Sequence, residues 1–370
     1  MTAAAPSAAG RHQHEAWRER RVPPVERIRP GLWSLPIVIP DSPLRYVIVY
    51  AIELPDGVAL VDSGWPHDES WRALESGLES TGFAVEDVRY VLITHSHTDH
   101  HGLTQRIKER SGAVVAMHAV EREVIREIDA GLPGAAAAGT AWLRDRGASP
   151  GQLATMHEQM AHGSTPDFDA VLPDVVIQDG DRPLPGRPDV VALWTPGHTR
   201  GHLCFLLEND RILLSGDHVL PRITPHVTRP AFVPLDPALT TYLDSLRRML
   251  ELDVDEVLPA HEYRFSDLPS RIGTMLDHHE ERFLEILDAV RAGARTTWEV
   301  AERISWSRGW EATSGFMRQT ALAETYTHLK HLEAEGRVRQ ASSHPDAWVI
   351  DDGARPVEHL RTMRQQLLRG

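Results

Sequence analysis

The stretch of sequence that most constrains the fold is residues 94–102, which consists of Thr-His-Ser-His-Thr-Asp-His-His-Gly. It directly follows the apolar run 90–93, which predicts a short buried strand. Imidazole and carboxylate groups are costly to bury unless a partner binds them, and a metal ion suits both groups. His95 and His97 alternate along an extended segment, so both can face the same way. The pattern therefore predicts a metal site at a strand end; a solvated, histidine-rich loop is the alternative interpretation.

Three later strand ends also carry histidine or aspartate. Apolar runs predict strands at 190–194, 211–214 and 254–258. His198, Asp217 and His261 each follow one of these runs by a few residues. In layered α/β proteins, loops at the carboxyl edge of a sheet converge on one site. Four such strand ends in one chain therefore predict a single composite site.

The order of the remaining elements indicates an α/β (α+β) layered domain. Strands are predicted at 32–39, 46–52, 58–61 and 113–117, and helices at 70–80, 103–110, 237–252 and 276–292. Asp62 follows the third strand, where it is either a turn former or a residue that orients a metal-binding histidine. From 118 to about 163 the pattern is helical, with a glycine- and alanine-rich part at 131–139 that predicts a loop. We expect this insertion either to cover the active site or to decorate the surface.

At 370 residues, the chain is long enough for two domains. We expect a flexible N-terminal tail at 1–24, a catalytic domain at 25–292 and a small C-terminal domain at 293–370. The C-terminal part has predicted helices at 298–304 and up to about 335, followed by two short strands around a turn. This order of elements is that of a winged helix. The segment is not strongly basic, so we expect it to pack or to border the substrate site rather than to bind nucleic acid.

Composition limits the classes of function. The formal net charge is −14, from 39 basic and 53 acidic residues, which does not favour general binding to phosphate backbones. The single cysteine, Cys204, excludes an intrachain disulfide and fits a reducing cytoplasm. No run approaches the ~18 consecutive apolar residues of a membrane span, and the first residues lack the pattern of a secretory signal. We therefore expect a cytoplasmic protein without a membrane partner, and leave a homo-oligomer open.

Taken together, the motifs resemble those of the metallo-β-lactamase superfamily. They are H-x-H-x-D-H at 95–100, T-P-G-H-T-x-G-H at 195–202, G-D at 216–217 and A-H at 260–261, with an earlier D-x-G at 62–64. The resemblance covers residues from about 30 to 261. It implies an αββα sandwich, in which two mixed sheets lie face to face with helices outside. A similar C-terminal winged helix occurs in one branch of the superfamily, which includes acyl-thioester hydrolases and an endoribonuclease.

The resemblance also implies a ligand set. One metal ion would be bound by His95, His97 and His198, a second by Asp99, His100 and His261, and Asp217 would bridge them. Two metals about 3.5–4 Å apart lower the pKa of a shared water and polarise a carbonyl or phosphoryl oxygen. Mixed imidazole and carboxylate ligands suit Zn best, and also Fe or Mn. Asp99 and Asp217 are the catalytic candidates within this set.

Several functions are compatible with such a centre. We expect a dinuclear hydrolase of an ester, thioester or lactone with a small or carrier-bound acyl group. The set without a nearby cysteine is closer to glyoxalase II-like thioesterases, lactonases and nucleases than to zinc β-lactamases, which argues against cleavage of an antibiotic. A metal-dependent ribonuclease or phosphodiesterase, with the winged helix as its nucleic-acid-binding module, is the alternative; the acidic charge counts against it. A non-catalytic metal-sensing regulator and a redox enzyme with iron are also left open.

Other polar residues near the motifs are candidates for substrate contacts. His218 and His226 follow Asp217, and Tyr263 follows His261, so all three are candidates to touch the substrate. A purely structural role is the alternative for each. We expect His101 and His202 to support the site rather than to bind metal.

Overall fold

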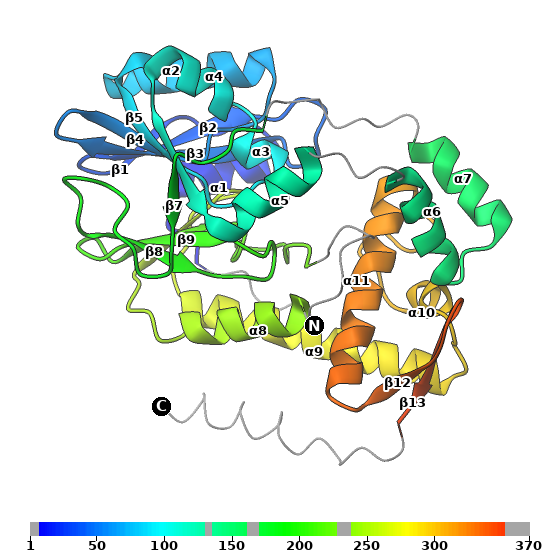
Figure 1. The fold of residues 1–370 in the computed structure, drawn as a ribbon. Coiled ribbons are helices and arrows are strands. Elements are labelled where there is room, and N and C mark those ends of the chain that lie inside the picture. The colour runs from blue at the N-terminus through cyan, green and yellow to red at the C-terminus, as the bar shows by residue number, and fades with distance from the viewer. Residues whose placement is uncertain (1–6, 130–134, 161–169, 228–237, 352–370) are drawn as a thin grey trace.

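The computed structural model describes residues 7–129, 135–160, 170–227 and 238–351, and two β-sheets lie face to face at its centre (Figure 1). The larger sheet has the order β1 (Glu26–Arg29), β2 (Leu32–Val38), β3 (Tyr46–Leu54), β4 (Gly57–Val61), β5 (Val88–Leu92), β6 (Val114–His118) and β7 (Val175–Ile177). The smaller sheet has the order β11 (Glu256–Pro259), β10 (Ile212–Gly216), β9 (Leu203–Leu207) and β8 (Val190–Trp194). Both sheets are mixed: strands β1 to β4 pair antiparallel and β4 to β7 parallel, while only β10 and β11 are parallel in the smaller sheet.

Helices cover the outer face of each sheet, which confirms the expected sandwich (Figure 1). On the larger sheet lie α2 (Asp68–Thr81) and α4 (Thr104–Ser111), and on the smaller sheet α8 (Ala238–Met249) and α9 (Leu268–Arg291). Helix α2 buries Trp71, Leu74 and Leu78 at helical spacing, and it ends at Gly82 in the left-handed conformation, φ 92°. Amphipathic faces of this kind are what hold each helix layer on its sheet.

The core between the sheets is apolar but is tied by two tyrosine hydroxyls. The hydroxyl of Tyr46 donates to the carbonyl of Glu262 at 2.6 Å, and that of Tyr50 donates to the carbonyl of Pro259 at 2.7 Å. Burial raises the pKa of both hydroxyls, so they remain protonated donors. These bonds fix strand β3 of one sheet against the end of β11 in the other.

The N-terminal segment is not a free tail in the part that the structure describes. Residues Arg11–Arg18 form helix α1, in which Gln13 and Ala16 are buried. The amide of Gln13 donates to the hydroxyl of Ser34 at 3.1 Å and accepts from the main-chain N–H of Arg264 at 2.9 Å. The expectation of a flexible tail at 1–24 is therefore wrong for this helix. Its charged sequence gives no local sign of burial, because its partners lie far along the chain.

The helical insertion packs against the C-terminal part of the chain. It forms α5 (Ala119–Asp129), α6 (Ala135–Asp145) and α7 (Pro150–Met160), so the loop predicted at 131–139 is wrong from residue 135 onward. Residues 131–134 and 161–163 lie outside the described residues. Leu143, Leu153 and Met156 share one buried cluster with Trp298 and Leu322. Helices α6 and α7 thus lie beside the C-terminal helices, as Figure 1 shows.

The C-terminal part follows the predicted order of elements. It comprises α10 (Thr297–Arg303), α11 (Gly315–Ala334), β12 (Val338–Ser343) and β13 (Asp346–Ile350), the two strands forming an antiparallel pair. The hydroxyl of Thr296 accepts from the N–H of Glu299 and caps α10. The winged-helix assignment stays a prediction, and residues 352–370 lie outside the described part. Within the described ranges, no helix combines the length and apolar character needed to cross a membrane.

Helices α9 and α11 meet at a buried pair of histidines. Nδ1 of His279 donates to Nε2 of His328 at 3.1 Å, and Nδ1 of His328 donates to the carbonyl of Glu324 at 2.8 Å. Burial lowers the pKa of His328 to about 3, and burial together with His328 lowers that of His279 well below its usual range. Both rings are therefore neutral in the folded protein at neutral pH.

This pair predicts a loss of stability in mild acid. The unfolded chain takes up protons below pH ~6.5 while folded His328 does not until about pH 3, so the free energy of unfolding falls as the pH drops through this window. Between pH 7.5 and pH 5.0, His328 alone contributes a decrease of about 2 kcal/mol. Denaturant titrations at both pH values should show a smaller decrease for His328→Gln than for the wild type. The control His12→Gln changes an exposed histidine and should show the same decrease as the wild type. An equal decrease in the free energy of unfolding for all three proteins would contradict the prediction.

Candidate metal centre

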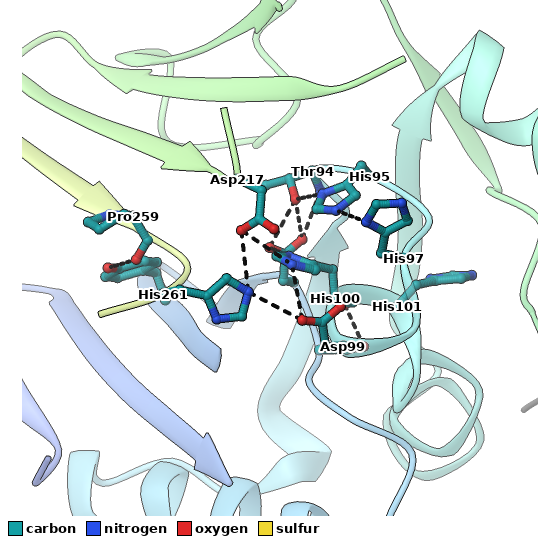
Figure 2. Close-up of polar contacts among 12 residues, drawn as sticks. Thr94, His95, His97, Asp99, His100, His101, Asp217, Pro259 and His261 are labelled. Carbon is teal, nitrogen blue, oxygen red and sulfur yellow. Dashed lines mark hydrogen bonds and ion pairs between the residues drawn. The ribbon is translucent and has the colours of Figure 1, made fainter. Parts of the chain in front are cut away.

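The predicted ligands and Asp62 come together at one edge of the two sheets, on loops that leave five different strands. Asp62 follows β4, the 94–102 stretch follows β5 and includes α3 (Thr98–His101), and His198, Asp217 and His261 follow β8, β10 and β11. Figure 2 shows the side chains of Asp99, His100, Asp217 and His261 pointing toward one another. The composite site inferred from strand ends is thus present in the fold. Binding of metal by these residues is a proposal that the geometry supports.

Three imidazoles form the first donor cluster. Nε2 of His95 lies 3.0 Å from Nδ1 of His97, and Nε2 of His198 lies 3.2 Å from the former and 3.1 Å from the latter. Nitrogens that bind a tetrahedral ion at 2.0–2.1 Å lie about 3.3–3.4 Å apart. The three nitrogens therefore have nearly the spacing of the edges of one coordination tetrahedron.

A second donor cluster combines carboxylate and imidazole. Nε2 of His261 lies 3.2 Å from Oδ2 of Asp99, and Nε2 of His100 lies 3.7 Å from the same oxygen. Asp217 stands between the two clusters. Its Oδ2 is 3.6 Å from Nε2 of His198, while its Oδ1 is 3.4 Å from Nε2 of His261 and 3.6 Å from Nε2 of His100. One oxygen thus faces each cluster, as a bridging carboxylate would.

The buried polar atoms at this centre fit divalent cations. Nε2 of His100, Nε2 of His261 and Oδ1 of Asp217 are buried without a hydrogen-bond partner among the described residues. The opposite ring nitrogens are already engaged, since Nδ1 of His100 donates to Asp62 at 2.8 Å and Nδ1 of His261 donates to the carbonyl of Tyr46 at 3.1 Å. These hydrogen bonds fix the tautomers and leave the Nε2 lone pairs directed at one another and at a carboxylate. A cation between them satisfies all of these atoms at once.

Protonation differs between the two clusters. Burial lowers the pKa of His95 well below its usual range and that of His198 to about 3, so both rings are neutral and ready to bind metal. Burial alone would raise the pKa of Asp217, but His261 and His100 hold it well below the usual range. Burial likewise opposes protonation of His100, yet Asp99 and Asp217 raise its pKa. A metal ion bound in the second cluster would therefore replace protons shared between carboxylates and imidazoles.

A second layer of hydrogen bonds holds the ligands in place. Besides His100, Asp62 accepts from the main-chain N–H of Thr94 at 2.8 Å and from its hydroxyl at 3.0 Å. Asp62 therefore has the orienting role that we considered for it. Behind Asp217, Nε2 of His202 accepts from the main-chain N–H of Asp217 at 3.2 Å. Gly216, φ 51°, is required there because a Cβ would lie 2.7 Å from that ring nitrogen.

The sequence analysis missed Glu121, on the first turn of α5. Its fully buried carboxylate accepts from the N–H of Ser96 at 2.9 Å, from the hydroxyl of Ser96 at 2.6 Å and from the N–H of Gly201 at 2.7 Å. Ser96 lies between His95 and His97, and Gly201 lies on the loop of His198. One carboxylate thus joins the two loops that carry the first donor cluster. No motif marks it, because its partners are 25 and 80 positions away.

The structure corrects two of the three expected substrate contacts. The ring of His218 is fully buried and packs on Tyr242, with centroids 4.9 Å apart. Tyr263 is 1% exposed, because Trp17 of α1 covers it at a centroid distance of 5.5 Å. Neither side chain can meet a substrate in this arrangement. His226 is exposed, and its carbonyl accepts from Nδ1 of His198 at 2.7 Å, so its role as a substrate contact stays a prediction.

His101 does not belong to the centre. Figure 2 shows its ring pointing away from the donors, and it is fully buried with Nδ1 2.9 Å from the hydroxyl of Thr104. Burial lowers its pKa to about 4. This placement agrees with a supporting role.

Glu121→Gln tests the connection between the two ligand loops. The amide cannot accept from all the N–H and O–H donors that the carboxylate serves, so we expect the affinity for the first metal to fall about 10- to 100-fold while the fold is retained. Competition with a chelator of known affinity measures this change, and circular dichroism checks the fold. Glu123→Gln is the matched control, because Glu123 is exposed on the same helix. Unchanged metal affinity in a folded Glu121→Gln protein would remove this role.

Several known proteins are similar in sequence to part of this chain. A family model for the metallo-beta-lactamase superfamily matches residues 43–261. A lactamase-like protein of Aspergillus niger is 29% identical over 243 residues, which are 64% of this chain and 57% of that protein. An atrochrysone carboxyl ACP thioesterase of Cryptosporiopsis sp. is 27% identical over 221 residues, 51% of this chain and 65% of that protein. The chain thus covers less than two thirds of the length of either relative.

Solved structures share the fold. A metallo-beta-lactamase family protein from Thermus thermophilus superposes with a TM-score of 0.70 at 29% identity, covering 88% of this chain and all of that one. A beta-lactamase domain protein from Burkholderia ambifaria gives a TM-score of 0.70 at 23% identity, covering 88% of this chain and 94% of that one. Because the family model matches more than half of this chain, and the matched residues 43–261 include all seven proposed donors, the chain belongs to the metallo-β-lactamase superfamily.

Proposed function

We propose that this protein is a dinuclear metal-dependent hydrolase that cleaves a thioester, with esters and lactones as substrates of the same chemistry. The observation that carries the proposal is the pair of donor clusters with Asp217 between them. The first cluster places three imidazole nitrogens at nearly the spacing of one coordination tetrahedron, and the second holds buried atoms without a hydrogen-bond partner among the described residues. Zinc is the metal we propose, since His95, His97 and His198 supply an all-imidazole set.

The choice of a thioester is supported by the relatives. One matched protein is an atrochrysone carboxyl ACP thioesterase of Cryptosporiopsis sp., and a protein of the same name from Aspergillus fumigatus is 33% identical over 127 residues. On this basis we propose an acyl group bound to a carrier as the substrate class. A covalent mechanism through Cys204 has no support, because that thiol is fully buried and burial raises its pKa to about 12.

The geometry suggests what the chain's own residues contribute. Two divalent ions, when bound, would lower the pKa of a shared water and polarise the substrate carbonyl. The side chains of Asp99 and Asp217 are 17% and 12% exposed, whereas that of His100 is fully buried, so the two carboxylates line the open side of the centre. Although burial opposes it, His100 and His261 lower the pKa of Asp99, so its carboxylate is ionised at neutral pH. The departing thiolate of a thioester is a good leaving group and needs little protonation.

Metal removal and Asp217→Ala test the proposal together. Chelator treatment should lower kcat/KM for an acyl thioester at least about 100-fold, and Zn²⁺ should restore it. Asp217→Ala should lower kcat/KM by at least the same factor and reduce the bound metal from two ions toward one. Thiol release assays and elemental analysis measure these effects. The control Asp277→Ala changes an exposed carboxylate on α9 and should behave as wild type. Hydrolysis that survives both chelation and Asp217→Ala would refute the proposal.

A further inference from the structure

An arginine-lined pocket lies where the end of α1 meets the loop between β2 and β3. Its lining residues are Trp17, Arg18, Arg20, Pro43 and Arg45, and its volume is about 400 Å³. The chain as a whole carries a net charge of −14, so three guanidinium groups around one pocket form a local reversal of charge. No ligand of the metal centre is part of it.

Two residues that line the pocket are next to residues of the metal centre in the fold. Arg45 directly precedes Tyr46, whose carbonyl accepts from Nδ1 of the donor His261 at 3.1 Å. On the other wall, Trp17 packs on Tyr263, two residues after His261. The β2–β3 loop therefore lies at the same edge of the sandwich as the donors. Between them lie Tyr46 and Tyr263, both of which are buried.

The positive charge of the pocket is not neutralised by the protein. Within the described residues, Arg18, Arg20 and Arg45 form no ion pair with a carboxylate; the guanidinium of Arg45 donates only to the carbonyl of Trp17, at 3.4 Å. Glu19, on the same segment, pairs with Arg21 instead. Clustered guanidinium groups without counter-charges favour an anionic ligand.

Two of the pocket arginines have an unusual backbone conformation, and a fourth arginine lies next to the pocket. Arg20 and Arg45 have φ values of 57° and 70°, a conformation that is unfavourable for residues with a Cβ. The fold thus holds the backbone of two of the three arginines in this conformation at a cost in free energy. The guanidinium of Arg222 lies over the ring of Trp17, 4.7 Å from its centroid, and brings a further positive charge next to the pocket.

We propose that this pocket binds the phosphate of a phosphopantetheine arm, the part that CoA and acyl carrier proteins share. Planar guanidinium groups bind phosphate oxygens through paired, charge-assisted hydrogen bonds. The arm carries its thioester at the end opposite the phosphate, so a phosphate held at the rim directs the thioester toward the metals. The inference rests on the proposed thioesterase function, because that function supplies the arm.

Binding of two probes that differ only in the phosphate tests the pocket. For the full-length, metal-loaded protein, calorimetry should give a dissociation constant for 4′-phosphopantetheine at least about 10-fold lower than for pantetheine. In the double variant Arg18→Gln, Arg20→Gln, this ratio should fall to about 1. The control Arg308→Gln alters an exposed arginine of the C-terminal part and should keep the wild-type ratio. Equal affinity of the wild type for both probes, or a preference that survives in the double variant, would overturn the inference.

The same experiment separates the inference from the proposed function, because neither probe is hydrolysed. A phosphate preference without thioester hydrolysis would refute the function and leave the pocket; hydrolysis without a preference would do the reverse. CoA and a holo acyl carrier protein then distinguish the source of the arm. Whichever of these two molecules binds more weakly to the double variant than to the wild type is the one that uses the pocket. If both bind the double variant as tightly as the wild type, the inference is contradicted.

Discussion

Imidazole lone pairs and carboxylate oxygens that are buried against one another form the interaction on which the rest of this structure depends. Each such group loses hydration when the two sheets close over it, and nothing but a cation can compensate for several of them in the same space. The second cluster shows this most directly, because Nε2 of His100, Nε2 of His261 and Oδ1 of Asp217 have no hydrogen-bond partner among the described residues. The free energy of metal binding and that of folding are therefore coupled at this edge.

Much of the surrounding fold can be understood as a means of holding those donors. Strands of two sheets deliver them, and tyrosine hydroxyls tie the sheets where His261 leaves β11. Asp62 fixes the ring of His100, and Glu121 joins the loops of His95 and His198. These supporting groups bind main-chain atoms or ring N–H groups, so each of them sets the position of a ligand without occupying a coordination position.

The segments outside the sandwich are linked to one another. Helices α6 and α7 share a buried cluster with α10 and α11, and Arg146 forms an ion pair with Asp346 at 3.1 Å. The insertion and the C-terminal part thus pack against each other, although the second half of the sandwich lies between them in the sequence. Near the start of the described chain, α1 packs over Tyr263, and Trp17, Arg18 and Arg20 line the pocket at its end. Helix α1 and the described C-terminal elements therefore both pack on the sandwich.

The sequence by itself indicated most of the strands and the strand ends that carry histidine or aspartate, because apolar runs and closely spaced polar residues are local patterns that do not need a partner to be recognised. The full set of seven proposed donors came from the resemblance of the motifs to a known superfamily. Only the tertiary structure decided in which direction each side chain points and which distant residues it contacts. It buried His218 and Tyr263 away from the open side, gave Glu121 its partners on two distant loops, and turned the charged segment of α1 into a packed helix. The arginine pocket arises in the same way, from the end of α1 and the β2–β3 loop, which are neighbours only in space. Side-chain direction and long-range contact depend on how elements pack, and neither is encoded in the spacing of residues along the chain.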